Sequence, residues 1–327
     1  MFLPISVLAS TFSVIAVITV AAATPATIYP RSNCTNPNIR KEWRKLSRSE
    51  QVNYVEAVNC LTTKPSRIGL QSTLYDDFPY VHNQLNNEIH SVASFLPWHR
   101  YFVHVYEGAL KECGYKGSAT YWDWTLDALS PSTSSIWDGS IGFGGNGSPF
   151  VTEPQEGSPR KCVTDGPFKT LRPHWITSGS QQHCLSRSWN NGSDEVGQML
   201  GEFYSPEVVD GVQATPNYIQ YRSTLEGGPH GAIHSAIGGD MGPATSPNDP
   251  IFFLHHTQID RLWYLWQQED PRKRLSEYGG IRTQDQFDGV IPPEAMVEDW
   301  LPMRGVADDL QVKDLLLTES NLLCYSY

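Results

Sequence analysis

The sequence predicts a mainly α-helical fold, a helical bundle core with long loops and few short strands around it. Apolar residues recur at helical spacing over 48–61, 98–113 and 250–268. Each of these stretches begins beside residues that can start a helix. Between them, residues 130–193 are rich in Gly, Ser, Pro and Asn, a composition typical of loops.

The first predicted helix follows a polar arm at 24–39, which we expect to be extended. Ser47 and Glu50 have the spacing of a capping box, in which each side chain accepts a hydrogen bond from the other residue's backbone N–H. The helix over 48–61 then has one buried side, formed by Val52, Val55 and Val58. A loop around 65–77 separates it from the next segment.

The second helix is predicted over 98–113, because Pro97 suits a first helical turn and apolar residues follow at helical spacing. The third begins at Pro250, with Asn248 or Asp249 as its cap, and a kink at its histidine pair is left open. Two short helices are expected between them, over 194–203 and 216–225.

The chain of 327 residues has no break in composition, so we expect one large domain over 24–327 after a signal peptide at 1–23. Residues 2–23 carry no charge and end in three alanines, as signal peptides do before a cleavage site. The run is also long enough to span a bilayer, so an uncleaved anchor is the alternative. Three glycosylation sequons fit secretion into the extracellular space: they begin at Asn33, Asn146 and Asn191.

The formal net charge is −11 and no basic run is present. This composition disfavours nucleic acid and anionic membranes as partners, and no membrane association is expected once the signal peptide is cleaved. Small neutral substrates fit it better. The sequence does not indicate an oligomeric state.

Two sets of histidines stand out. The first lies near the start of the second helix, at spacings of eight and nine residues: His82, His90 and His99. The second lies downstream, and its first two members are four residues apart on one helical face: His230, His234, His255 and His256. Helical histidines are more often packed core residues than ligands, but three neutral imidazoles together can bind a borderline metal ion and leave room for another ligand.

The residue types around these histidines narrow the choice of metal. Neither set has a cysteine or a carboxylate at ligand spacing. Structural zinc sites and non-haem iron sites use thiolate or carboxylate ligands, so two all-imidazole sets favour a coupled pair of copper ions. His174 and His183 lie in the loop-rich region, and we interpret both as non-ligands.

The same segments resemble the two copper signatures of the tyrosinase family. Copper-A residues are matched by His90, Phe95, Trp98, His99, Arg100 and Glu107. Copper-B residues are matched by Asp249, Pro250, Phe252, His256 and Asp260. The resemblance runs from about Cys34 to the end of the chain and is nearest to short secreted fungal tyrosinases and catechol oxidases. It implies a tyrosinase-type copper catalytic domain with a type-3 binuclear site, whose two copper ions are bound by His82, His90, His99, His230, His234 and His256.

The resemblance also suggests roles for four further positions. Glu226, four residues before His230, matches an acid that holds a water near copper B and could serve as a general base; the alternative is a solvated loop carboxylate. Gly231 stands where efficient phenol hydroxylases often have Asn. Pro243 occupies the gate over copper A, where it should leave access fairly open. Phe252 either stacks near the substrate ring or belongs to the core.

Other residues near the copper signatures have plainer candidate roles. Asp249, Asp260 and His255 could orient ligand rings, but for the two aspartates helix capping or ion pairing is at least as good an interpretation. From residue 272 onward little periodicity is present, so we expect loops and short strands. The final Tyr325 and Tyr327 resemble the tyrosine motif that closes the catalytic domain in this family, and no C-terminal lid domain is expected after them.

By this resemblance the chain is expected to use O2 to oxidise ortho-diphenols to ortho-quinones, with weaker hydroxylation of monophenols. Its partners would be small phenolic substrates and O2. A true tyrosinase with substantial monophenolase activity is the near alternative, and a phenol-tailoring enzyme of secondary metabolism is a special case of either. An oxygen carrier of the haemocyanin kind is a remote alternative, which the open gate and the single short domain disfavour. A secreted binding module without copper would require all six histidines to serve no purpose.

Six cysteines in a secreted chain suggest three disulfides, with fifteen pairings formally open. The pairing that we favour joins Cys34 to Cys324, Cys60 to Cys113 and Cys162 to Cys184. Some relatives link a nearby cysteine to the second copper-A histidine by a thioether. No cysteine lies in the four residues before His90, so that short-range form is absent, whereas a link from a distant cysteine is left open.

Overall fold

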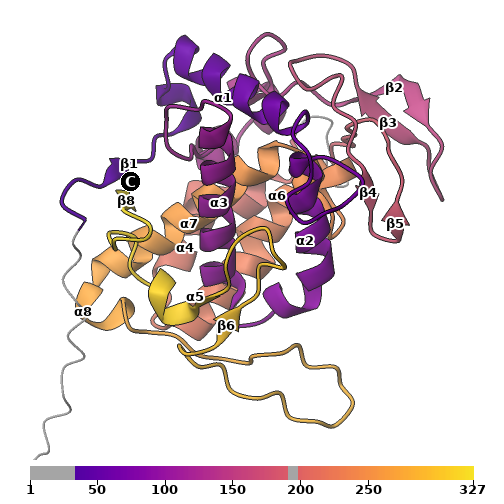
Figure 1. Ribbon diagram of the computed structural model, residues 1–327. Coiled ribbons are helices and arrows are strands. Elements are labelled where there is room, and N and C mark those ends of the chain that lie inside the picture. Colours follow the sequence, from indigo (N-terminus) through magenta and orange to yellow (C-terminus); the bar gives the residue numbers. More distant parts are fainter. Residues whose placement is uncertain (1–33, 191–197) are drawn as a thin grey trace, which may run out of the picture.

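The computed structural model describes residues 34–190 and 198–327. Within them, long helices form a bundle, and loops with two-stranded sheets surround it (Figure 1). The predicted mainly α-helical class, with a bundle core, long loops and few short strands, is therefore confirmed. No helix in the described part of the chain has both the length and the apolar character that a membrane span needs.

Helix α3 (Phe95–Glu112) stands at the centre of the bundle (Figure 1). It packs against α1 (Arg48–Leu61), α2 (Leu74–Ile89) and α7 (Ile251–Glu269). The shorter helices are α4 (Pro206–Gln213), α5 (Tyr218–Leu225), α6 (Gly231–Ile237) and α8 (Pro271–Arg274). Nearly every aromatic ring on the inner sides of α2, α3 and α7 is buried, so these helices share one apolar core.

Each sheet of the described chain has two strands. The parallel pair joins the two ends of the domain: β1 (Asn38–Ile39) and β8 (Tyr325–Ser326). The antiparallel pairs are β2 (Gly147–Glu153) with β3 (Arg160–Val163), β4 (Trp175–Ile176) with β5 (Gly179–Ser180), and β6 (Trp300–Leu301) with β7 (Leu310–Gln311). The tail after residue 272 contains β6, β7 and β8 between loops, as predicted.

Of the predicted helix starts, that of α1 is correct, whereas α2 and α3 begin earlier than expected. Helix α1 covers the predicted residues, and the capping box of Ser47 and Glu50 is formed. The loop expected to reach residue 77 ends earlier, because Thr73 and Asp76 form a second capping box that starts α2. Helix α3 starts three residues before the prediction. Pro97 is its third residue, in the first turn, where a missing N–H costs no intrahelical hydrogen bond.

Helix α7 runs for 19 residues without a break, so the kink left open at its histidine pair does not occur. Asp249 accepts a hydrogen bond from the backbone N–H of Ile251 at the start of this helix (3.2 Å). Of the two short predicted helices, 216–225 corresponds to α5. The other lies partly outside the described residues, and its described end forms only the 3₁₀ turn Gly201–Tyr204.

The segment predicted as loop over 130–193 is more structured than its composition suggests. It contains the β2–β3 hairpin at the upper right of Figure 1 and several 3₁₀ turns. Arg187 holds it from within, because its guanidinium donates to the carbonyls of Phe143, Gly144 and Gly145. A buried arginine can satisfy several loop carbonyls at once, so a Gly-rich segment keeps one conformation here.

All three predicted disulfides are present: Cys34–Cys324, Cys60–Cys113 and Cys162–Cys184. No cysteine is left free, so none is available for a thioether to His90. The first disulfide ties the two ends of the domain together beside the β1–β8 pair. The predicted signal peptide and the sequons at Asn33 and Asn191 lie outside the described residues.

Asp260 on α7 lies at the centre of a buried ion network. Its carboxylate accepts hydrogen bonds from the guanidinium groups of Arg40 and Arg100 and from the hydroxyls of Tyr325 and Tyr327. The interpretation of Asp260 as an ion-pairing residue is therefore correct. The two tyrosines close the domain by bringing the C-terminal strand onto the central helices.

Glu107 on α3 extends this network and generates a pH-dependent prediction. Burial alone would raise the pKa of Glu107, but Arg40 and Lys111 lower it from 4.5 to about 2. A lowered folded-state pKa stabilises the protein above about pH 4.5, and the contribution is lost as the pH falls toward 2. We therefore expect Glu107→Gln to reduce the free energy of unfolding by roughly 3 kcal/mol at pH 7 and by much less at pH 3.

Urea unfolding at the two pH values measures this difference. Glu112→Gln is the matched control, because Glu112 lies on the same helix and its ion pair with Arg67 is largely exposed. It should change stability little at either pH. An equal loss for Glu107→Gln at pH 7 and pH 3 would contradict the assignment.

Candidate metal centre

The first histidine cluster, cluster A, is formed by His82, His90 and His99. Helix α2 carries His82, His90 directly follows its last residue, and His99 is the fifth residue of α3. One ring nitrogen from each lies within 4.8 Å of the others. His82 and His99 are buried, whereas His90 is partly exposed. The spacing of eight and nine residues therefore spans a helix, its end and the first turns of the next helix.

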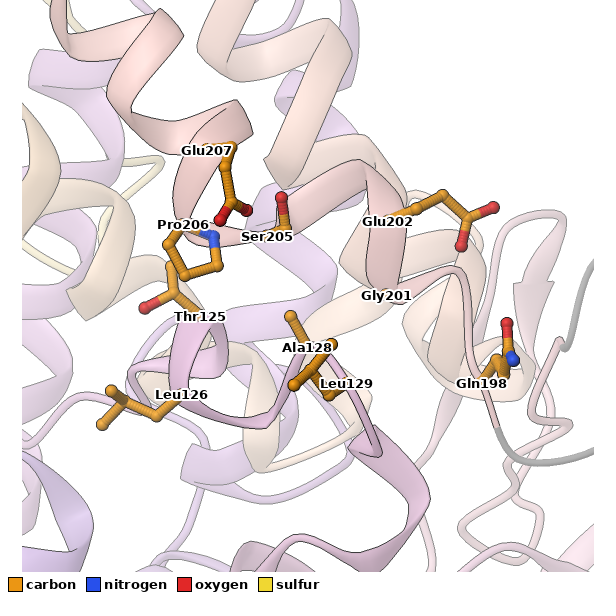
Figure 2. A pocket seen from close by; sticks show the side chains of 10 residues that line it. All are labelled: Thr125, Leu126, Ala128, Leu129, Gln198, Gly201, Glu202, Ser205, Pro206 and Glu207. Carbon is orange, nitrogen blue, oxygen red and sulfur yellow. The ribbon is translucent and has the colours of Figure 1, made fainter.

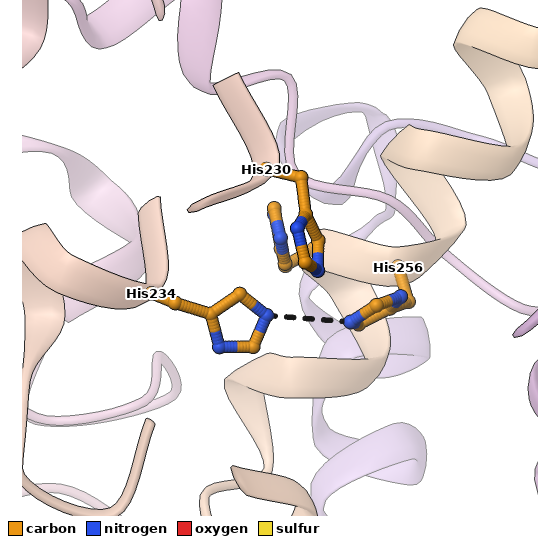
Figure 3. Close-up of side chains that lie close together, drawn as sticks. His230, His234 and His256 are labelled. Atoms are coloured by element: carbon orange, nitrogen blue, oxygen red, sulfur yellow. Dashed lines mark hydrogen bonds between the residues drawn. The ribbon is translucent and has the colours of Figure 1, made fainter. Parts of the chain in front are cut away.

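The second cluster, cluster B, contains His230 and His234 together with His255 and His256. The local chain has a wide π-type turn over Glu226–His230, in which Gly228 departs from helical geometry (φ −98°, ψ −112°) before α6 begins. This turn brings His230 close to His234, and both face His256 on α7 (Figure 3).

The two clusters face one another across a short gap. The rings of His99 and His256 stack with centroids 4.4 Å apart and planes 15° apart. Phe95 lies 4.8 Å from both His99 and His230, so one aromatic ring packs against both clusters. Clusters A and B therefore form a single centre.

Backbone carbonyls fix the ring nitrogens of five histidines. The Nδ1 atoms of these rings lie 2.6–3.1 Å from carbonyl oxygens, so each Nδ1 carries the proton and donates it. The pairs are His82 with Ala244, His90 with Asn86, His99 with Phe95, His230 with Glu226 and His234 with Met241. In each ring Nε2 is left with a free lone pair, the arrangement that metal-binding imidazoles adopt.

Within cluster A these lone pairs point at each other. His82 Nε2 and His99 Nε2 lie 3.3 Å apart, and neither carries a proton to share. Two buried lone pairs at this distance repel each other unless a cation lies between them. Imidazole nitrogens bind ions such as zinc at about 2.0–2.1 Å, so both can reach one ion.

Cluster B fits a metal ion for similar reasons. His234 Nε2 lies 3.4 Å from His256 Nε2, the contact dashed in Figure 3. His230 Nε2 is buried without a hydrogen-bond partner. The residues present therefore fit a metal ion in each cluster, and the absence of thiolates and carboxylates from both sets fits copper.

Burial keeps these rings neutral. It lowers the pKa of His90 and of His234 to about 4, with neighbouring histidines adding to the effect at His90. The pKa values of His82, His99, His230 and His256 are also lowered well below 6.5, first by burial and then by the other rings. At neutral pH all six imidazoles can therefore offer a lone pair without first losing a proton.

His255 is closer to the centre than the sequence interpretation required. Its ring stacks on His230 with centroids 5.3 Å apart, and both of its nitrogens are buried without a partner. His256 instead lies between the clusters, against His99 and His234. This position favours His256 as the ligand of the pair, with His255 packed behind it.

Glu226 is neither solvated nor free. It is buried, and its carboxylate accepts hydrogen bonds from the backbone N–H of Ser91 (2.5 Å) and from Arg222 (2.6 Å). Burial raises the pKa of Glu226, against the lowering effects of Ser91 and Arg222. Ser91 directly follows His90, so the carboxylate also ties the cluster-B turn to the end of cluster A.

The three predicted substrate-binding residues differ in how exposed they are to solvent. Gly231 is partly exposed at the start of α6, and Pro243 is exposed on the connection between α6 and α7. Phe252 has no exposed surface and packs 4.1 Å from the ring of His256 and 5.2 Å from that of His82. Of the two roles considered for Phe252, the core role is therefore favoured over contact with substrate.

Several contacts that shape the centre were not predicted from the sequence. Arg187 forms a buried two-point ion pair with Asp249 just before α7, at 2.7 and 2.9 Å. His183 bonds the carboxylate of Asp240, and His174 bonds Ser180, so neither joins a histidine cluster. No local pattern marks these partners, because each contact joins segments that fold together only in three dimensions.

A separate cavity of about 350 Å³ lies at the start of α4 (Figure 2). Leu126 and Leu129 line it on one side and Glu202 and Glu207 on the other. None of its lining residues is a histidine, so it does not belong to the metal centre.

Helices that turn two clusters of neutral imidazoles toward each other define a protein built for a pair of metal ions. Residues 72–269 match the sequence model of the common central domain of tyrosinase. The chain therefore belongs to the tyrosinase family, whose members hold a binuclear copper site, and it is an oxidase.

Individual relatives agree with this assignment. The chain is 41% identical to tyrosinase-like protein phomQ1 of Diaporthe leptostromiformis over 338 residues. This alignment covers 97% of this chain and 86% of that protein. Tyrosinase ustQ of Aspergillus flavus is 40% identical over 295 residues, covering 90% of this chain and 80% of the other. A mutant polyphenol oxidase from Thermothelomyces thermophila superposes with a TM-score of 0.76 at 31% identity, covering 89% of this chain and 88% of that one.

The adjacent pair His255 and His256 provides a direct test of the ligand set. We expect His256→Ala to bind one copper ion per chain instead of two and to lose activity, because cluster B then lacks the ring nearest cluster A. His255→Ala, the matched control one residue away, should keep two ions and part of the activity. Metal analysis after dialysis measures both, and two ions in His256→Ala would overturn the assignment.

Proposed function

We propose that this chain is a secreted binuclear copper oxidase that converts ortho-diphenols to ortho-quinones. One copper ion would be held by His82, His90 and His99, and the other by His230, His234 and His256. The observation that carries the proposal is the pair of unprotonated Nε2 atoms of His82 and His99, facing each other beside a second imidazole cluster. The bound copper pair would supply the O2 chemistry, in which two diphenols give up four electrons and four protons and one O2 becomes two waters.

The chain's own groups have three tasks in this reaction. Backbone carbonyls hold the ring orientations, so little reorganisation is needed when substrate arrives. Phe95 and Phe252 exclude water from between the clusters. Glu226 can take the proton of a phenolic hydroxyl, because its two hydrogen bonds leave acceptor positions free and burial moves its pKa toward the working range.

Access to the centre is proposed to lie beside Gly231 and Pro243. His90 and His234 are the partly exposed members of the two clusters, and both of the proposed substrate positions reach the surface. A proline at the gate cannot swing a large ring over the site. This supports an open entrance suited to small phenols.

A true tyrosinase with substantial monophenolase activity is the second candidate, and a phenol-tailoring enzyme of secondary metabolism is a special case of either. Two relatives carry the word tyrosinase in their names, which favours it. Gly231 favours the ortho-diphenol oxidase, because no side chain at this position can help Glu226 to hold a water.

Secretion has indirect support. Three disulfides are present, and disulfides form and persist in oxidising compartments. Residues 1–23 and the sequons provide further support from the sequence. N-terminal sequencing of protein recovered from the culture medium tests the cleavage near residue 23, and recovery only with cells would count against it.

Oxygen uptake by the copper-loaded protein tests the proposed activity. With 4-tert-butylcatechol we expect rapid uptake, and with tyramine slow uptake after a lag, because no Asn assists Glu226. The same assay on His256→Ala gives the background rate without an intact copper pair. Comparable rates on both substrates would instead establish the tyrosinase candidate.

Gly231→Asn tests the reason for that preference. A Cβ at this helical position would meet only the carbonyl oxygen of Glu226, at 3.4 Å, an ordinary contact distance. We expect the variant to raise the tyramine rate several-fold and to leave the catechol rate within about twofold. Gly231→Ala is the control, since it adds the Cβ without the amide. A tyramine rate that rises equally in both variants would rule out a role for the amide.

A further inference from the structure

A short segment between α6 and α7 contacts one histidine of each cluster. We call residues 238–245 the strap. Within it, the carbonyl of Met241 accepts a hydrogen bond from His234 Nδ1 (2.6 Å), and the carbonyl of Ala244 accepts one from His82 Nδ1 (2.7 Å). A displacement of the strap would therefore turn a ring in cluster A and a ring in cluster B together.

No other segment of the described chain has this role. The Nδ1 atoms of His90, His99 and His230 each donate to the carbonyl four residues earlier in their own helix or turn. These three rings depend only on local geometry. His82 and His234 depend on where the strap lies.

A single buried carboxylate anchors the strap. Asp240 Oδ2 accepts hydrogen bonds from the backbone N–H and the hydroxyl of Ser186, at 2.7 and 2.9 Å. Its Oδ1 accepts from His183 Nε2 at 2.9 Å and from Arg160 at 3.3 Å. The backbone N–H of Asp240 donates to the carbonyl of Ser186 (2.9 Å). All of these donors lie in or beside the β3 region rather than on the helices.

The strap lies directly on the segment that bears these donors. Gly238 and Gly239 have positive φ angles of 59° and 55°, and a Cβ on either would lie within 2.5 Å of the carbonyl oxygens of Ser188 and Ser186. Arg187, between those serines, forms the two-point ion pair with Asp249 that precedes α7. Residues 186–188 therefore fix both the strap and the start of α7, the helix that carries His256.

The outer face of the strap borders a cavity of about 880 Å³ whose lining includes Arg160, Asp240, Pro243 and Thr245. Arg160 is buried, and its Nε has no hydrogen-bond partner. On this side the hydrogen bonds of Asp240 hold the strap, while Met241 is buried in the apolar core on its inner side.

We propose that Asp240 is a positioning residue for both metal sites at once, acting through the strap on His82 and His234. This inference rests on the proposed function, because it takes the two clusters to be copper sites. It makes the metal affinities of clusters A and B depend on one carboxylate that binds no metal itself.

Asp240→Asn tests the proposal, because an amide nitrogen cannot accept hydrogen bonds from His183 and Arg160. We expect the affinity for copper(I) to fall at both sites, by about 10- to 100-fold, the usual effect of losing a group that orients a ligand. Competition against a chromophoric copper(I) chelator measures both equivalents. Wild-type affinity for either equivalent would overturn the proposal.

Glu42→Gln is the matched control. It removes the charge of a buried carboxylate that pairs with Arg44, without touching the strap or either cluster, so it should lower stability but leave both copper affinities unchanged. Equal losses of affinity in the two variants would mean that general destabilisation explains the effect, and this too would overturn the proposal. If Asp240→Asn does not fold, Ser186→Ala removes one hydroxyl donor to the same carboxylate and should show a smaller effect at both sites.

A metal-free measurement separates this inference from the proposed function. In ¹⁵N-histidine NMR of the metal-free wild type, His82 and His234 should each show one tautomer with the proton on Nδ1. In Asp240→Asn both should become tautomer mixtures, while His99 stays unchanged. Unchanged tautomers in the variant would reject the strap's role. A wild type that binds no copper would reject the proposed function, and the NMR comparison would still decide the role of the strap.

Discussion

The rest of the structure depends on the need to hold six uncharged imidazoles, with their lone pairs facing inward, in a largely buried core. Burial keeps these rings neutral, and in five of them a backbone carbonyl fixes the other nitrogen. Three of them donate to the carbonyl four residues earlier, so the helical turn that delivers His90, His99 or His230 also sets its tautomer. This arrangement explains why the proposed ligands lie on helices or at their ends and why the turn before α6 is widened at Gly228.

Buried aspartates hold the helices and the strap in register around these rings. Asp260 binds two arginines and two tyrosines, Asp249 binds Arg187, and Asp240 binds the donors near β3. Buried ion pairs add little stability relative to apolar packing, but removing one partner is costly, so they favour one geometry over its alternatives. Here each carboxylate joins segments distant in sequence, which suits a centre assembled from residues between 82 and 256.

Much of this was predictable from local patterns. The capping box at Ser47, the long apolar periodicity of α3 and α7 and the two histidine sets each depend on residues within a few turns of one another. The partners of Glu226 and the role of the strap were not predictable, because Ser91 lies 135 residues from Glu226 and Ala244 lies 162 residues from His82. Phe252 is a further example. The sequence placed it beside the second histidine set, but its complete burial depends on how α7 packs against α2 and α3.

The position of Pro243 has a consequence for how this enzyme can change. Pro243 lies between Met241 and Ala244, the two residues whose carbonyls orient His234 and His82. A substitution at Pro243 that alters the proposed entrance would therefore also act on the backbone between the carbonyls that orient two proposed ligands. Substrate range and metal retention are in this way genetically coupled, so gate mutations should show strong epistasis with residues such as Ser186 and Arg160. Directed evolution toward bulkier phenols would progress faster by altering residues beyond the strap than by altering Pro243 itself.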